Sequence, residues 1–402
     1  MYSRLTIKDI SVFLPKRFMQ FFSSQAKLGI LGGGQLGKML LYTTRKWDIT
    51  THVLDPSKDA PSRIACDYFV QGDFSDYQTV YDFGKNLDVL TIEIEHVNTA
   101  ALKQLEKEGV STYPNAATLE LIQNKGVQKD FYAQHNIPTS AHLRFENLSL
   151  LQQAVKTGKL QYPFVWKAAK MGYDGNGVKI IRSEENMEYL TDQECMVEGL
   201  VPFTHELAVT VVRNPSGEVK TYPVVEMEFH PEANQVEYVL CPARIEESIK
   251  EKATEIALQV SNALDHVGLL AVELFLTEDG EILVNEVAPR AHNSGHHTIE
   301  TSITDQFEQH IRAVLDLPLG NTELITSGVM VNLVGAAGHG GQVHYNNIET
   351  ALNIKGVCPH IYGKKQTRPF RKMGHVTIID QDINSARETA EKVKQLITVI
   401  SN

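Results

Sequence analysis

The chain of 402 residues has few cysteines, no long apolar run and no excess of basic residues. Its four cysteines are widely spread and form no CxxC pair, which excludes a disulfide framework and a cysteine-bound zinc site and favours a reduced, cytoplasmic protein. No apolar run approaches the roughly 18 residues that span a membrane. Because the net charge is -11, the basic footprint of nucleic-acid binding is missing. We therefore expect neither nucleic acid nor membrane as a partner.

The first 25 residues lack the regular pattern of the rest. Basic residues alternate there with phenylalanines, but Asp9 and the absence of an arginine-rich pattern argue against an organelle-targeting peptide. We expect residues 1–25 to form an extension without a catalytic role. Deletion of residues 1–24 should then leave a soluble, active protein.

Short β-type runs alternate with helical stretches at the start of the folded region. The pattern predicts strands over residues 27–31, 50–54, 67–71 and 89–94, and helices over 35–46 and 77–85. Such alternation indicates a parallel, doubly wound sheet.

The remaining chain is long enough for one or two further domains. A long helix is predicted over residues 116–135, followed by a smaller unit at 141–201 with strands at 164–168 and 178–181. Antiparallel strands are expected over 206–286, interrupted by a helix over 246–266. A final strand-rich module starts near residue 329 and closes with a helix around 385–397.

A hairpin near residue 280 carries two acidic residues in an apolar setting. Asp279-Gly280 is a strong signal for a two-residue turn, and such a turn places Glu273 directly opposite Glu286. Facing carboxylates repel each other, so a bound divalent cation would explain them. An all-oxygen site suits Mg²⁺, with Mn²⁺ as an alternative. The other interpretation is a solvent-facing hairpin that tolerates both glutamates.

Cationic and glycine-rich segments lie on either side of this hairpin in the sequence. Arg290, His292, Asn293 and His296 follow it in a short polar stretch, which suits an anion. Upstream, residues 171–177 contain three glycines and Lys167 precedes them, so this segment could fold over a triphosphate. An exposed loop is the alternative. Together, these segments indicate chemistry on phosphorylated substrates.

The glycine-rich turn at residues 32–37 supports a competing hypothesis. It connects a predicted strand to a predicted helix, where backbone N–H groups can approach a phosphate. Asp55 follows the second strand, as the ribose-binding acid does in dinucleotide-binding folds. An NAD-dependent oxidoreductase is therefore an alternative from a different class.

Two further segments are candidates for ligand contacts. The strand end at residues 198–201 could offer its main chain to an adenine edge, and Glu206 could accept a ribose hydroxyl. Residues 362–375 form a compact basic loop in a strongly acidic chain. Because Pro369 and Gly374 break this loop, it fits a phosphate clamp better than a solvated charge run.

Taken together, these motifs resemble the ATP-grasp superfamily, and specifically its N5-carboxyaminoimidazole ribonucleotide synthase family. The resemblance runs from about residue 27 to beyond 380 and rests on GILGGGQLGKML, TIEIEHV, KAAKMGYDGNG, NEVAPRAHNSGHH and YGKKQTRPFRKMGH. It implies a mixed α/β and α+β architecture. The implied parts are a Rossmann-like domain at 26–120, an ATP-grasp region at 121–325 with a mobile lid at about 141–201, and a small β-rich domain at 326–402.

The resemblance implies ATP- and Mg²⁺-dependent carboxylation of 5-aminoimidazole ribonucleotide by bicarbonate, through carboxyphosphate, in purine biosynthesis. The partners are then the ribonucleotide and bicarbonate, and the family implies a homodimer. The closest alternative is a formate-dependent glycinamide ribonucleotide transformylase or another ATP-grasp ligase. A non-catalytic nucleotide sensor is a further alternative, although the metal pair and the anion-binding groups are intact.

The resemblance also implies roles for individual residues. The positions that match ATP contacts are Lys125, Lys167, Gly172, Tyr173, Asp174, Gly175, Asn176, Gly177, Val178, Glu198, Gly199, Leu200, Val201, Glu206, Glu226, Asn285 and Glu286. The positions that match the ribonucleotide and bicarbonate region are Gln35, Glu95, Tyr173, Asp174, Arg290, His292, Asn293, Lys364 and Arg371. Glu273 and Glu286 match the metal ligands, and Lys167, Asp174, Arg290 and His292 are the expected catalytic residues.

Two positions depart from the pattern of the family. Asn176 stands where many relatives carry a basic residue. Phe370 replaces a frequent glycine in the basic loop, so the turn there could have a different geometry.

Overall fold

The computed structural model describes residues 21–22, 25–170, 177–230 and 235–401. Its N-terminal domain contains a parallel five-stranded sheet in the order β3-β2-β1-β4-β5. The strands are β1 (Lys27–Leu31), β2 (Thr50–Asp55), β3 (Tyr68–Gln71), β4 (Val89–Ile92) and β5 (Ser111–Tyr113), and the helices are α1 (Gln35–Lys46), α2 (Tyr77–Gly84) and α3 (Thr99–Lys107), with a short 3-10 helix η1 (Pro61–Ile64). The predicted doubly wound arrangement is confirmed.

The long helix predicted over residues 116–135 is wrong, because two helices cover this stretch. They are α4 (Ala116–Ile122) and α5 (Lys125–Gln134). Between them the Asn124 side chain accepts hydrogen bonds from the N–H groups of Gly126 and Val127, at 3.0 and 3.1 Å. Asparagine at this position is a strong helix N-cap. The second helix therefore starts at Lys125.

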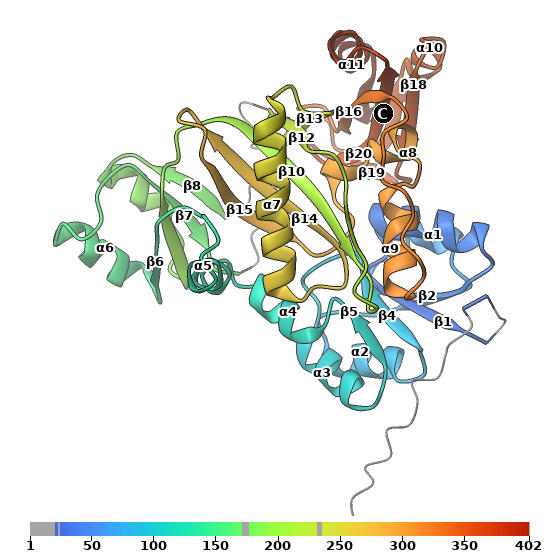
Figure 1. Cartoon of the computed structure of the whole chain (residues 1–402), viewed down its shortest axis with the longest axis horizontal. Helices are drawn as coiled ribbons and strands as arrows, with labels where there is room; N and C mark the ends of the chain where they lie inside the picture. The colour runs from blue at the N-terminus through green and yellow to red at the C-terminus, as the bar shows by residue number, and fades with distance from the viewer. Residues whose placement is uncertain (1–20, 23–24, 171–176, 231–234, 402) are drawn as a thin grey trace, which may run out of the picture.

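A small antiparallel unit follows and projects from the body of the molecule (Figure 1). Its strand order is β6-β9-β7-β8. The elements are β6 (His142–Phe145), α6 (Leu148–Lys156), β7 (Phe164–Ala168), β8 (Val178–Ile181), a short 3-10 helix η2 (Glu184–Tyr189) and β9 (Cys195–Gly199). We call it the lid unit. The strands on either side of the glycine-rich segment are β7, which ends at Ala168, and β8, which begins at Val178. These two strands pair with each other.

A large antiparallel sheet forms the centre of the molecule, in the order β15-β14-β10-β12-β13-β16-β20-β18, with β11 paired to β10. The strands are β10 (Phe203–Arg213), β11 (Val219–Thr221), β12 (Val225–Phe229), β13 (Val236–Cys241), β14 (Gly268–Thr277), β15 (Ile282–Ala288), β16 (Ser327–Val334), β18 (Val357–Ile361) and β20 (Lys372–Asp380). Since β13 pairs with β16, one sheet continues from the strands before α7 into β16, β20 and β18 near the C-terminus.

Helices pack on this central sheet, and a smaller sheet lies beside it. The long helix α7 (Glu247–Leu264) lies across β10 and β14 (Figure 1), and its apolar face joins their buried residues in one core. The other elements are η3 (Asn293–Gly295), α8 (Thr298–Thr301), α9 (Gln306–Val314), α10 (Ile348–Ala351), α11 (Ile383–Leu396) and the strands β17 (Gly341–Asn346), β19 (Gln366–Thr367) and β21 (Thr398–Ser401).

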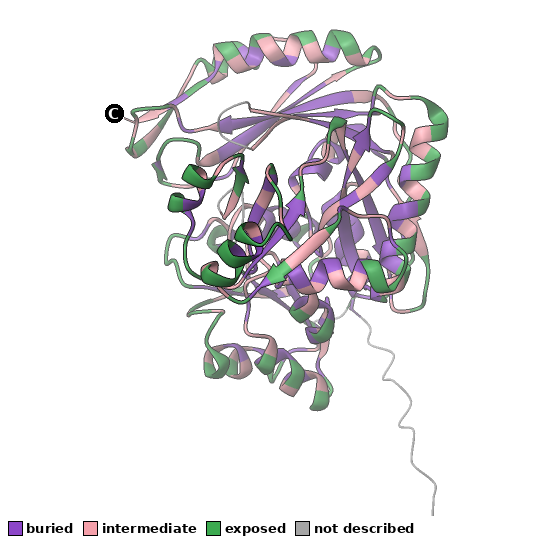
Figure 2. Ribbon diagram, turned by 90° about the vertical axis from the view of Figure 1, so that its left-hand side faces the viewer, coloured by how far each residue is buried: buried purple, intermediate pink, exposed green. Residues whose placement is uncertain are grey.

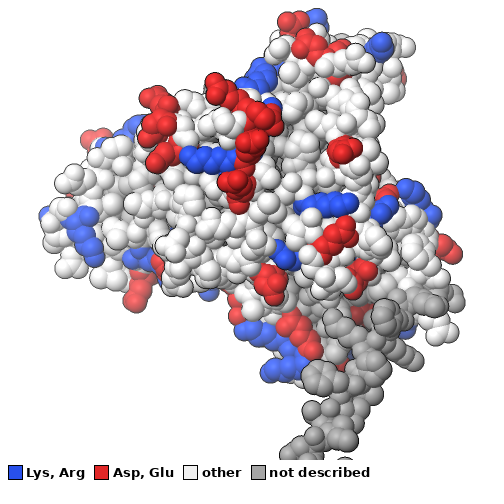
Figure 3. All heavy atoms as spheres, in the orientation of Figure 1, with Lys and Arg blue, Asp and Glu red and all other residues white. Residues whose placement is uncertain are grey.

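Burial follows these layers. The strands of the central sheet are largely buried, whereas the outer helices expose one side to solvent (Figure 2). On the described surface of the face in Figure 3, acidic and basic side chains are interspersed without a continuous basic area. In the part of the chain that the structure describes, no helix is long and apolar enough to cross a membrane.

Packing begins before the predicted start of the first domain. Phe21 is buried in the core that includes Ala26, Leu28 and residues of α1 and α9. Phe22 contacts Trp47 edge-on, with ring centroids 5.9 Å apart. Residues 1–20 and 23–24, the rest of the expected extension apart from Gln25, lie outside the described residues. The end of the extension is therefore attached to the fold by a buried aromatic ring.

Candidate active site

The two glutamates of the predicted metal site are direct partners across β14 and β15. Glu273 pairs with Glu286, as the two-residue turn predicted, although the turn itself is different. Thr277 N–H donates to Glu281 O at 2.9 Å, so the loop contains three residues, with Gly280 at φ +79°. A β-bulge at Asn285 then shifts the register back by one residue. The predicted pairing is confirmed, but it results from two deviations that cancel.

The electrostatic environment of this pair suits a cation. Desolvation, together with Glu286 and Glu206, raises the pKa of Glu273. Desolvation also opposes the ionisation of Glu286, but Lys125 and Lys167 outweigh it and lower the pKa of that carboxyl. Among the described residues no group of three or more His, Cys, Asp or Glu side chains could hold a metal ion. A pair of carboxylates is nevertheless a usual Mg²⁺ site, because water and substrate phosphates complete its coordination.

Three lysines and Glu198 lie on one side of this pair, next to Glu286. We call Lys125, Lys129, Lys167, Glu198 and Glu286 the lysine cluster. Lys125, at the start of α5, forms an ion pair with Glu286. Lys167 on β7 forms an ion pair with Glu198 and donates to Asn285 Oδ1 at 3.0 Å. The bulge therefore turns Asn285 toward a cationic group. The cluster brings together residues from the lid unit, α5 and β15, where a triphosphate could contact them.

Arg290 and His292 lie on the other side of the glutamate pair. His292 Nε2 is 3.4 Å from Glu273 Oε1. Arg290 forms an ion pair with Glu95 at 2.9 Å, and among the described residues its buried Nε atom has no hydrogen-bond partner. Asn293 exchanges two hydrogen bonds with Asn332, at 2.9 and 3.0 Å, which fixes its amide. The structure thus links the predicted anion site to the N-terminal domain through Glu95.

The glycine-rich turn binds carboxylates of the protein itself. Gly33 N–H donates to Asp55 Oδ2 at 2.7 Å, while Gly34 and Gly37 N–H donate to the two oxygens of Glu93, both at 2.8 Å. An N–H cradle occupied by carboxylates cannot also hold a pyrophosphate. Asp55 therefore caps the turn instead of binding a ribose, and the dinucleotide interpretation is wrong. Gln35, the first residue of α1, is half-buried beside this turn.

The strand end at Glu198, Gly199, Leu200 and Val201 closes the lid unit, since β9 ends at Gly199. Glu206 lies on β10 beside β14, and burial raises its pKa to about 7, with Glu286 adding to the effect. Val178 begins β8 opposite Lys167, and Gly177 immediately precedes this strand. Five expected contacts lie outside the described residues: Gly172, Tyr173, Asp174, Gly175 and Asn176.

The basic loop folds back on itself beside a cavity of about 550 Å³. Lys364 lines this cavity and donates to Lys372 O at 2.8 Å. Arg371 donates to Gln366 O at 2.6 Å and is half-buried. Phe370 adopts φ +61°, the left-handed conformation that glycine favours. The turn therefore keeps a glycine-like geometry despite the phenylalanine.

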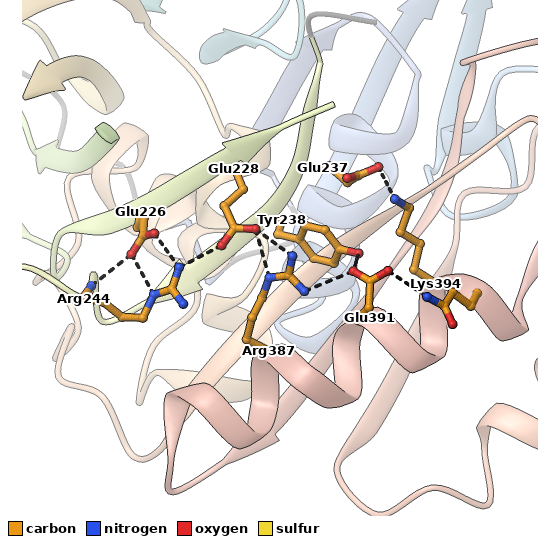
Figure 4. A network of polar contacts seen from close by, with 9 residues as sticks. Glu226, Glu228, Glu237, Tyr238, Arg244, Arg387, Glu391 and Lys394 are labelled. Carbon is orange, nitrogen blue, oxygen red and sulfur yellow. Dashed lines mark hydrogen bonds and ion pairs between the residues drawn. The ribbon is translucent and has the colours of Figure 1, made fainter. Parts of the chain in front are cut away.

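Glu226 belongs to a chain of ion pairs (Figure 4). Both of its oxygens accept hydrogen bonds from Arg244, the shortest at 2.6 Å. From there contacts continue through Glu228 to Arg387 on α11, and on to Glu391 and Tyr238. We call these six residues the arginine–glutamate network. Because the Glu226 carboxylate is fully engaged, a nucleotide hydroxyl would have to displace Arg244 to reach it.

Comparison with known families covers most of the described fold. A model of the ribonucleotide synthetase preATP-grasp domain matches residues 25–123, and one of the ATP-grasp domain matches residues 130–307. A model of the phosphoribosylaminoimidazole carboxylase C-terminal domain matches residues 328–389. The N5-carboxyaminoimidazole ribonucleotide synthase of Bacillus subtilis is 38% identical over 89% of this chain and 92% of its own. The chain belongs to the N5-carboxyaminoimidazole ribonucleotide synthase family.

Solved structures of this family have the same fold. The Thermotoga maritima N5-carboxyaminoimidazole ribonucleotide synthetase matches with a TM-score of 0.86 and 43% identity, over 94% of this chain and 100% of its own. The Aspergillus clavatus N5-carboxyaminoimidazole synthase, in complex with ADP and the aminoimidazole ribonucleotide, matches with a TM-score of 0.84 and 33% identity, over 92% and 98%. The chain spans 65% of the length of a longer relative, the chloroplastic phosphoribosylaminoimidazole carboxylase of Vigna aconitifolia, with 38% identity over 89% of this chain.

Several residues in or near the candidate site were missed by sequence reasoning. Lys129 lies one helical turn after Lys125, and a second lysine at this spacing shares the same helix face. That signal was present in the sequence. Glu93 and Arg244 gave no such signal, because their roles depend on which strands and loops become neighbours.

Proposed function

We propose that the chain catalyses ATP-dependent carboxylation of 5-aminoimidazole ribonucleotide by bicarbonate, giving N5-carboxyaminoimidazole ribonucleotide, ADP and phosphate. The observation that carries this proposal is the Glu273–Glu286 pair, which has lysines on one side and Arg290 and His292 on the other. Family membership supports the substrate, since the Aspergillus clavatus relative binds ADP and this ribonucleotide.

The carboxylates fit a magnesium ion by their chemistry. Glu273 and Glu286 supply oxygen ligands, and their direct opposition is repulsive without a cation. When bound there, Mg²⁺ neutralises charge on the ATP phosphates during phosphoryl transfer. Lys125 and Lys167 add fixed positive charge for the same phosphates.

The residues around Arg290 form the second half of the site. Bicarbonate attacks the γ-phosphate of ATP and forms carboxyphosphate, which Arg290 and His292 hold in place. Carboxyphosphate then releases carbon dioxide and phosphate, and the exocyclic amine of the ribonucleotide captures the carbon dioxide. Asp174, the residue that we assign to orienting or deprotonating this amine, lies outside the described residues. Closure of the lid unit over the site would keep water from carboxyphosphate.

The basic loop is assigned to the 5′-phosphate of the ribonucleotide. Lys364 and Arg371 supply its charges, and Gln35, Glu95 and Asn293 complete the substrate contacts. Arg371 already donates to the main-chain carbonyl of Gln366, so its side chain is held in the loop before the phosphate binds. We further propose that the enzyme acts in the cytoplasm as a homodimer.

An assay of ADP release tests this function. The full chain, with Mg²⁺ and ATP, should release ADP rapidly only when both the aminoimidazole ribonucleotide and bicarbonate are present. Parallel reactions contain glycinamide ribonucleotide and formate, the substrates of the alternative ATP-grasp enzyme. Turnover with formate and none with bicarbonate would overturn the assignment.

A further inference from the structure

Lys129 is a buried charged residue that the proposed chemistry does not use. Its side chain is 2% exposed, and its ammonium group donates to Thr139 Oγ1, Ser140 Oγ and Val284 O at 2.7, 3.1 and 3.1 Å. It also lies 3.2 Å from Glu198 Oε2. These contacts occupy all of its donors. Lys129 is therefore fixed behind the site and cannot reach a nucleotide itself.

Glu198 lies between Lys129 and Lys167. One carboxylate oxygen pairs with Lys167, while the other accepts from Ser140 Oγ at 2.6 Å and faces Lys129. The Glu198 side chain is only 4% exposed. The two lysines together outweigh the effect of burial and lower the pKa of Glu198, so the carboxylate is charged. A single buried carboxylate thus has two cationic partners.

ATP binding changes this balance of charge. Lys167 is shared between Glu198 and Asn285, so a triphosphate that attracts its ammonium weakens the ion pair with Glu198. Removing one partner of a buried ion pair is strongly unfavourable, because the other charge remains without compensation. A second, immobile cation beside Glu198 avoids this cost.

We propose that Lys129 is a positioning residue for ATP binding, because it neutralises Glu198 and thereby lets Lys167 engage the nucleotide phosphates. The inference depends on the proposed function only through the assignment of Lys167 to ATP. Lys129 acts through Glu198 and Lys167 and touches no substrate.

Titration of Lys129 gives an independent expectation. Burial, with the added repulsion of Lys167, lowers its pKa to about 8, while Glu198 and Glu286 act in the opposite direction. When Lys167 moves toward phosphate, its repulsion falls and Glu198 attracts the Lys129 proton more strongly. Binding of ADP without Mg²⁺ should therefore take up a proton near pH 8, and its affinity should fall as pH rises through this range.

The decisive experiment measures binding of ADP with Mg²⁺ by calorimetry in Lys129→Met, Glu198→Gln and the double variant. Lys129→Met should weaken binding roughly ten- to a hundredfold, because Lys167 becomes the only counter-charge of Glu198. The double variant should regain most of this loss, since a neutral glutamine at position 198 needs no counter-charge and the contact with adenine assigned to this position comes from its main chain. Lys103→Met, which removes an exposed ion pair with Glu120, is the matched control and should bind normally.

Two results would overturn the inference. One is a double variant that binds as weakly as Lys129→Met or more weakly, because a packing role predicts no recovery. The other is normal nucleotide affinity in Lys129→Met. If Lys129→Met does not fold, wild-type titrations with ADP at pH 8 in buffers of different ionisation heat decide the question. Mg²⁺ is left out of these titrations, because burial and Glu286 raise the pKa of Glu273 to about 8 and a cation there would release a proton. Proton uptake supports the inference, and its absence contradicts it. Failure of the proposed function is distinguishable, because nucleotide binding would then persist without bicarbonate-dependent turnover.

Discussion

The Lys129–Glu198–Lys167 part of the lysine cluster and the Arg244–Glu228–Arg387–Glu391 part of the arginine–glutamate network contain similar ion pairs but differ in their exposure to water. Side chains of Lys129, Glu198 and Lys167 are 2%, 4% and 8% exposed, whereas Arg244 and Glu391 of the network are 35% and 42% exposed. In water-exposed pairs, screening and side-chain entropy offset most of the attraction. Among the buried side chains of Lys129, Glu198 and Lys167, a change of charge on one residue leaves a neighbour uncompensated. The cluster can therefore sense a ligand charge, while the network only connects the central sheet to α11.

Glu286→Gln is expected to have the largest effect. The substitution keeps the shape of the side chain but removes one charge from the proposed metal pair and from the partner of Lys125. The protein should fold and lose most of its ATP turnover, by about a hundredfold or more, the scale of other electrostatic groups in catalysis. ADP release and circular dichroism measured on the same sample check this. Near-normal turnover in a well-folded protein would contradict the metal assignment.

Arg371→Ala tests the basic loop, which lies outside both regions of the comparison. Loss of a charge-assisted phosphate contact costs about 1.5–3 kcal/mol, so the KM for the ribonucleotide should rise roughly ten- to a hundredfold. The KM for ATP should stay nearly constant. The neighbouring Arg368→Ala is a control for the loss of charge. If the ATP constant rises and the ribonucleotide constant does not, the loop belongs to the other substrate.

Truncation at the N-terminus tests the apolar packing of Phe21, whereas the other substitutions test polar contacts. Deletion of residues 1–20 should leave stability and activity unchanged, whereas deletion of residues 1–24 also removes the buried Phe21 ring. Burial of such a side chain contributes about 1.5–3 kcal/mol, so the longer deletion should lower the melting temperature. Equal melting temperatures for the two truncated proteins would show that Phe21 does not stabilise the fold.

Glu391→Gln should have the smallest effect and is the counterpart of Glu286→Gln in the exposed network. Glu391 pairs with Arg387 at 3.3 Å, and Tyr238 can still donate to a glutamine oxygen. The free energy of unfolding should fall by less than about 1 kcal/mol, with turnover unchanged. Urea unfolding and the ADP assay measure both quantities. A loss of turnover in Glu391→Gln would contradict the proposal that only the lysine cluster responds to the charge of the ligand.

The sequence predicted those parts of the site that depend on local patterns. The strand–turn–helix at residues 27–46, the hairpin with Glu273 opposite Glu286 and the basic loop all follow from short-range signals. The bulge at Asn285 could not be predicted, because the contact of its side chain with Lys167 involves a strand more than a hundred residues away. The helix break at Asn124 was predictable, since asparagine is a preferred N-cap.

Tertiary contacts also decided the outcome for the glycine-rich turn. Its spacing is compatible with a dinucleotide, and only the position of β4 beside β1 places Glu93 on its N–H groups. Lys129 is a partly predictable case. Its spacing from Lys125 indicated a shared helix face, but its role depends on Glu198, which a sequence pattern does not bring near.

The most direct test of this account is a crystal structure of the full chain with ADP and Mn²⁺, using the anomalous signal of manganese. The account predicts a manganese peak between the Glu273 and Glu286 carboxylates. It also predicts that the Lys167 ammonium has moved from Glu198 to the nucleotide phosphates while Lys129 stays on Glu198. A manganese peak elsewhere, or Lys167 still paired with Glu198 beside bound ADP, would contradict it.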